Sequence, residues 1–138
     1  MVTRKVGFNE LMKAVYKRLD THNLTKNYTI HNYAPRNASF PYITLGTPIG
    51  ARSDSFSAQD IPAEENVLTI HVWSDYKGDK EASDMIDNIV QAITSSNLSF
   101  DSYTELICLF DYADITIDDT EPAKPIRHGI VRFRVHMA

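Results

Sequence analysis

Two segments of the chain carry apolar side chains at helical spacing, and the strand-forming sequence lies between and after them. In residues 8–19 six apolar side chains fall at i, i+3, i+4, i+7, i+8 and i+11, and residues 82–93 repeat this spacing. A single apolar stripe along a helix is typical of a helix that packs with one face on a flat apolar layer. We therefore expect two amphipathic helices that both rest on a sheet.

Several further stretches supply that sheet. Residues 67–74 are rich in β-branched and aromatic side chains, and residues 129–136 alternate apolar with polar ones. The other stretches are residues 41–50, residues 103–112 together with 115–117, and a weaker, edge-like stretch at 28–33. The order is helix, strands, helix, strands, without a helix after each strand. This order predicts an α+β fold, an antiparallel β-sheet with two amphipathic helices packed on one face.

Length and composition indicate one globular domain over residues 1–138. Hydrophobic residues make up 43% of the chain and charged residues 23%, which suffices for one core and not for two domains. The single cysteine, Cys108, excludes an intrachain disulfide and a cysteine-based zinc site or redox pair. The longest apolar run, Leu106–Phe110, is far shorter than a membrane span, and we expect neither membrane insertion nor secretion.

The charges of the chain are unevenly distributed. The net charge of −4 argues against generic nucleic-acid binding. Residues 1–18 carry five bases and one acid, residues 111–121 five acids and no base, and residues 124–138 four bases and no acid. Either these charges pair within the fold, or they form opposite-signed patches that suit head-to-tail self-association.

A search for catalytic chemistry finds no known arrangement of residues. The five glycines are scattered, so no phosphate-binding loop is predicted, and the HExxH, EF-hand and nucleophile-elbow motifs are missing. Four aspartates carry carboxylates suited to a hard cation, but their spacing fits no known metal-binding loop (Asp111, Asp114, Asp118, Asp119). Cys108 lies in an apolar strand, where a thiol behaves as a small hydrophobe. We expect no enzyme activity, no metal and no cofactor.

The histidines leave one alternative open. His71 lies in the middle of a predicted strand, and His128 and His136 share a face of the last strand because their spacing is even. Three histidines on adjacent strands could bind zinc, as a small metal- or ligand-binding domain would. The simpler interpretation, which we favour, is that His71 forms a hydrogen bond on the open face of a half-solvated sheet.

Aromatic residues gather around residues 28–42, with Lys26 and Arg36 close to them in the sequence. Such a pattern could indicate stacking on single-stranded nucleic acid. The local density of basic residues is low, however, and the net charge has the wrong sign. We therefore interpret these aromatic side chains as parts of a core and an interface.

Four blocks, in order along the chain, resemble the small tail completion proteins of long-tailed bacteriophages, the family of the tail-to-head joining protein. They are GFNELMKAVYKRL (7–19), FPYITLG (40–46), VLTIHVWSDYKGDKEASDMIDNIVQAI (67–93) and HGIVRFRV (128–135). The resemblance implies a non-enzymatic virion protein of the phage neck, made in the host bacterial cytoplasm. It also implies a hexameric ring of copies of the chain that caps the tail tube, stops its polymerisation and presents a surface to the head-completion protein of the connector.

The same resemblance leaves a head-completion adaptor of the connector as an alternative. In either role DNA can pass through the ring, and the family implies no sequence-specific nucleic acid and no membrane as partners. Proteins of this class resemble one another in a long loop between strands that becomes ordered on docking.

In this chain that loop is residues 51–66, which is polar and lacks periodicity. Its interface candidates are Arg52, Asp54, Phe56, Gln59, Asp60, Ile61, Glu64 and Glu65. The charged segments of the chain add Asp114, Asp118, Asp119, Glu121, Arg132 and Arg134.

Overall fold

The computed structural model describes residues 7–52, 64–100, 105–120 and 124–137. Its elements, in chain order, are α1 (Phe8–Thr21), β1 (Thr29–His31), β2 (Tyr42–Leu45), β3 (Ile49–Arg52), β4 (Glu64–Ser74), α2 (Lys80–Thr94), β5 (Glu105–Asp118) and β6 (Ile126–Met137). Both helices are thus where the apolar stripes predict them, and the two strongest strand predictions lie within β4 and β6.

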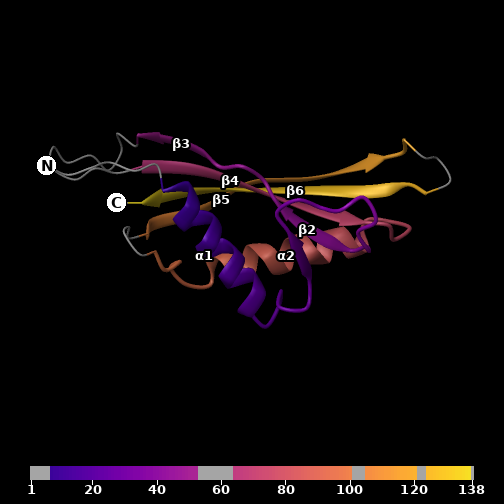
Figure 1. Ribbon diagram of the computed structural model, residues 1–138, viewed down its shortest axis with the longest axis horizontal. Coiled ribbons are helices and arrows are strands. Elements are labelled where there is room, and N and C mark those ends of the chain that lie inside the picture. The colour runs from indigo at the N-terminus through magenta and orange to yellow at the C-terminus, as the bar shows by residue number, and fades with distance from the viewer. Residues whose placement is uncertain (1–6, 53–63, 101–104, 121–123, 138) are drawn as a thin grey trace, which may run out of the picture.

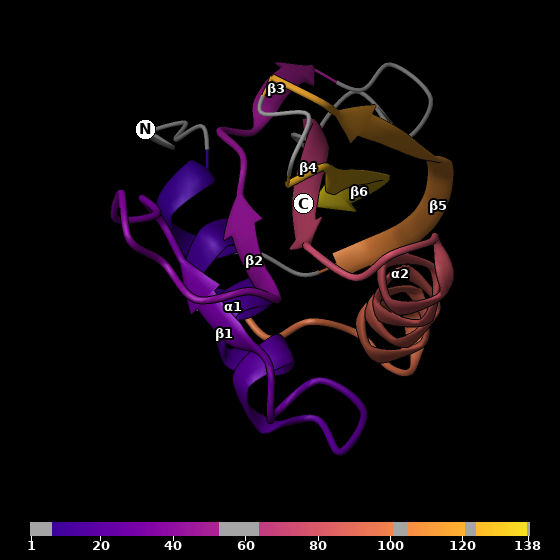
Figure 2. The same ribbon diagram turned by 90° about the vertical axis from the view of Figure 1, so that its right-hand side faces the viewer.

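All of these strands form one six-stranded sheet in the order β1-β2-β4-β6-β5, with β3 paired to β4 beside β2. Both helices cover the same face of the sheet (Figures 1 and 2). The α+β prediction is confirmed. The sheet is mixed, because β1 pairs with β2 in parallel while the other strand pairs are antiparallel.

The stretch at 41–50 forms two strands where the sequence predicts one. β2 ends with Leu45 paired to Ile70, and β3 begins with Ile49 paired to Val67. Between these two pairs, residues 46–48 lie opposite residues 68–69 of β4. One extra residue on one strand is the pattern of a β-bulge. Gly46 lies in this bulge, and its N–H donates to a carbonyl oxygen of β4 at 2.8 Å. A Cβ at Gly46 would lie 3.0 Å from that oxygen, so the close approach favours glycine.

The core lies between the helices and the sheet. The side chains of the predicted stripes that are fully or almost fully buried include Leu11, Val15 and Leu19 of α1 and Met85, Ile89 and Ile93 of α2. They pack on alternate residues of the central strands, which include Leu68, Ile70, Val72, Val131, Phe133 and Val135. At Gly129 α2 lies so close to β6 that an added Cβ would be 3.0 Å from Cδ1 of Ile86.

A single arginine joins the two helices. The guanidinium of Arg18 in α1 donates to the carbonyl oxygens of Ala92 at 2.8 Å, Ser96 at 3.0 Å and Asn97 at 2.9 Å. These carbonyls belong to the last turn of α2 and the residues after it, where helix carbonyls lack partners and a cation is favoured. Arg18 therefore fixes the end of α2 against α1.

Candidate interaction surface

The face of the sheet that the helices leave open carries a row of aromatic and histidine side chains. Alternation along β4 buries Val72 under α2 and turns His71 and Trp73 to the open face. The indole of Trp73 stacks on the ring of His128 in β6, with centroids 3.9 Å apart and planes 5° from parallel. Its Nε1–H donates to the hydroxyl of Thr44 in β2 at 3.0 Å. This row of side chains thus links β2, β4 and β6 through a hydrogen bond and a ring stack.

Two histidines meet within this row. Nδ1 of His71 and Nε2 of His128 lie 2.8 Å apart, a hydrogen bond in which one ring donates and the other accepts. Burial lowers the pKa of His71. Burial also lowers the pKa of His128, the nearby His71 lowers it further, and the carboxylate of Asp118 opposes this shift. The expected hydrogen bond of His71 on the open face is confirmed, with His128 as its partner.

The third histidine of the zinc alternative does not join this pair. His136 lies eight residues along β6 from His128, about 26 Å at the usual rise of a strand. Within the described residues, no three His, Cys, Asp or Glu side chains form a group that could hold a metal ion. The structure brings together two of the three histidines of this alternative, and the geometry is that of a hydrogen-bonded pair.

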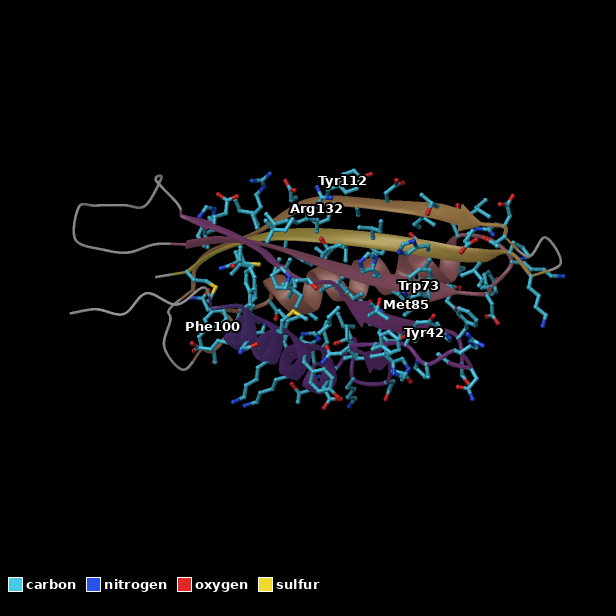
Figure 3. All side chains as sticks on the ribbon, turned by 45° about the horizontal axis from the view of Figure 1, so that its top comes forward. Tyr42, Trp73, Met85, Phe100, Tyr112 and Arg132 are labelled. Atoms are coloured by element: carbon cyan, nitrogen blue, oxygen red, sulfur yellow. The ribbon has the colours of Figure 1, made fainter. Side chains whose placement is uncertain are left out.

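The acidic segment and the basic last strand are neighbours in the sheet. Arg134 of β6 forms ion pairs with Glu65 of β4 at 2.6 Å and with Asp111 of β5 at 3.1 Å. The guanidinium of Arg132 lies 5.4 Å from the ring centroid of Tyr112. Figure 3 shows Arg132 and Tyr112 on the side of the sheet away from the helices. Part of the opposite charge is therefore paired within the chain.

The aspartates of β5 use their oxygens locally. The carboxylate of Asp114 accepts from the Tyr112 hydroxyl at 3.1 Å and from the N–H of Ile115 at 2.8 Å. The bond to Asp114 raises the pKa of the Tyr112 hydroxyl. Asp118 accepts from the N–H of Thr120 at 3.1 Å and from its hydroxyl, and these bonds lower the pKa of the Asp118 carboxyl.

β5 is an edge strand with exposed apolar side chains. Among the described strands, it pairs with β6 alone. Its exposed large side chains are Ile107, Leu109, Phe110, Tyr112 and Ile117, between 37% and 57% accessible. This surface could not be predicted from the sequence. Alternation shows that a strand has two faces, but it carries no signal that one side of the strand lacks a neighbour.

Three of the other predicted interface residues lie in the described part of the chain, and six lie outside it. Arg52 and Glu64 are opposite one another at the ends of β3 and β4, and Asp119 is exposed just after β5. The residues outside the described ranges are Asp54, Phe56, Gln59, Asp60, Ile61 and Glu121.

One surface pocket of about 400 Å³ lies at the start of α2. It is lined by Tyr28, Pro41, Tyr76, Lys80, Glu81, Asp84 and Met85. Lys80 and Asp84 form an ion pair at 2.8 Å between exposed side chains, one helical turn apart. None of the described helices is long and apolar enough to cross a membrane.

The fold is one that occurs in proteins of virions and phages. A chain in the structure "Virion of native gene transfer agent (GTA) particle" matches with a TM-score of 0.80 at 19% identity, over 98% of each chain. The gp17 protein of bacteriophage SPP1 matches with a TM-score of 0.60 at 20% identity, over 98% of this chain and 94% of that one. No curated protein sequence matches the chain.

The sequence itself identifies the family. Residues 11–138 match the model of the family described as tail completion protein gp17. The chain belongs to this family. It is therefore a structural protein of the phage virion, located in the neck region where the tail is completed. This confirms the resemblance that the four sequence blocks indicate.

Proposed function

We propose that the chain closes the tail tube at the end that meets the head. In this proposal, copies of the chain assemble into a hexameric ring on the last layer of the tube, stop its growth and present a surface to the head-completion protein of the connector. DNA passes through the ring on its way out of the head.

The match of residues 11–138 to the tail completion family carries this proposal. The fold adds support, because a chain of a gene transfer agent virion has the same fold over nearly its full length. The surface adds further support. An edge strand with exposed apolar side chains is costly in water unless another chain covers it, and a ring provides such a chain.

Binding to separated phage parts tests the proposal. Purified headless tails and tailless heads would each be incubated with the protein, pelleted and imaged in negative stain. The proposal predicts that the protein pellets with headless tails and adds density at one end of the tube, and that tails treated in this way then join heads. Binding to tailless heads alone would instead indicate a head-completion adaptor, and binding to neither would contradict both roles.

A further inference from the structure

The free edge of β5 lacks two of the usual protections of an edge strand. Natural edge strands are often blunted by lysine or proline, which block pairing with another chain. Residues 105–118 contain neither. The pairing of β5 with β6 is irregular between Glu105 and Ile107 and between Phe110 and Tyr112, and residues 107–110 form a short regular run between these two places. No other described strand pairs with the outer side of β5, so a further strand can align there.

The opposite edge of the sheet is formed by β3 at one end and β1 at the other. Within the described residues β3 pairs only with β4, and β1 only with β2. Ile49 at the start of β3 is 69% exposed, more than the exposed apolar side chains described in β5. The molecule therefore has a second free edge that also exposes an apolar side chain.

The segments that contain the two edges differ in charge. Residues 105–118 contain four acids and no lysine or arginine. Residues 22–52, which include β1, β2 and β3, contain Lys26, Arg36 and Arg52 and no acid at all. Complementary charge of this kind selects and orients partners. The acids of β5 and Arg52 of β3 thus suit the edge of one copy to the opposite edge of another, a head-to-tail contact that uses two different patches.

The strand directions also fit. β3 and β6 run antiparallel to β4, and β5 runs antiparallel to β6, so β5 runs in the direction of β4 and opposite to β3. When two copies stand side by side in the same orientation, β5 of one copy meets β3 of the next in antiparallel fashion. Antiparallel neighbours form regular hydrogen-bonded ladders.

The registers identify the residues that would meet. Leu109 pairs with Arg134, Arg134 with Val67, and Val67 with Ile49, so Leu109 and Ile49 lie at the same level on opposite edges of the sheet. Both are exposed, at 45% and 69%. Copies in a closed ring do not rise along the axis, so strands that run along that axis would bring Leu109 of one copy against Ile49 of the next.

We infer that copies of this chain join edge to edge, with β5 of one copy pairing with β3 of the next and Leu109 packing against Ile49, so that the sheets continue from copy to copy. This inference rests on the proposed function and specifies the contact between copies. The partner of the β5 edge is then a second copy of this chain.

Cross-linking between introduced cysteines tests the contact. Cys108→Ser removes the native thiol, and Leu109→Cys and Ile49→Cys place thiols on the two exposed edge positions. A bis-maleimide that spans about 10 Å tolerates a shift of one or two residues in the register. The reaction would be run in solution and on headless tails. One control is each single-cysteine variant. The other is the pair Leu109→Cys with Tyr16→Cys, because Tyr16 lies on α1 and is as exposed as Leu109, at 45%.

The inference predicts a ladder of covalent oligomers for Leu109→Cys with Ile49→Cys and none for the controls. Covalent dimers from Leu109→Cys alone would show that β5 pairs with β5, which overturns the inference. Protein that pellets with the tails but gives no ladder would also overturn it, while leaving the proposed function intact. Failure of the unchanged protein to pellet with tails would instead contradict the proposed function.

Discussion

His71 and His128 share a hydrogen bond of 2.8 Å between Nδ1 and Nε2, on the open face of the sheet. Two neutral rings can make this bond, and so can one neutral and one charged ring, but two charged rings cannot, because both nitrogens would then donate. Trp73 covers one of the two rings by stacking on it. The fold thus holds this pair in a form that resists full protonation.

Acid is therefore expected to destabilise the protein. The pKa values of both histidines lie below 6.5 in the folded chain, so the unfolded chain takes up protons first as the pH falls. The stability that the pair contributes is present above about pH 6.5 and is lost as the pH falls through the lowered pKa values. Urea unfolding between pH 8 and pH 5.5 measures this loss.

The matched variant for this prediction is His71→Gln with His128→Gln. Removing both rings should flatten the dependence of stability on pH between these limits. His31→Gln, which changes a histidine outside the pair, should leave the dependence in place. An unchanged slope in the double variant would assign the effect to other groups.

Arg18→Ala should destabilise the protein more than most substitutions on a surface helix do. The guanidinium donates to at least three carbonyl oxygens at the end of α2, and hydrogen bonds from a charged donor contribute about 1.5–3 kcal/mol. We expect a loss of about 2–3 kcal/mol in the free energy of unfolding, measured with urea. Lys17→Ala, an exposed neighbour on the same helix, should change stability by less than about 0.5 kcal/mol. An equal loss in both variants would contradict the role of Arg18.

Gly129→Ala should strain the contact between α2 and β6. The new Cβ would lie 3.0 Å from Cδ1 of Ile86 and 3.3 Å from Cβ of Val72, and overpacking of this kind costs about 1–3 kcal/mol. Ile86→Val removes Cδ1 and makes room. The double variant should therefore be more stable than the sum of the two single losses predicts, as measured in a double-mutant cycle. Simple additivity would show that the strain lies elsewhere.

The helices and central strands could be predicted because their signal is local. The stripes of residues 8–19 and 82–93 and the alternation in residues 129–136 follow directly from which side chains are buried. The division of residues 41–50 into β2 and β3 could not be predicted in this way. It depends on a bulge against β4, a strand that follows later in the chain.

The candidate surface was harder to predict because it depends on which strands are neighbours. The sequence indicates that His71 lies on an open sheet face, but only the pairing of β4 with β6 brings His128 within 2.8 Å. The same pairing of strands joins Arg134 to Asp111 within one chain. The position of β5 at an edge follows from the strand order, and no pattern within residues 105–118 encodes it.

The most direct test of the proposed role is a reconstruction of the tube end by cryo-electron microscopy. Headless tails would be purified from cells that lack this protein and imaged before and after its addition. We predict a single ring of six copies at one end of each tube, in a complete layer, and no further growth of the capped tubes when tube protein is supplied. Tubes that bind no ring, or that continue to grow from the end that carries it, would contradict the account.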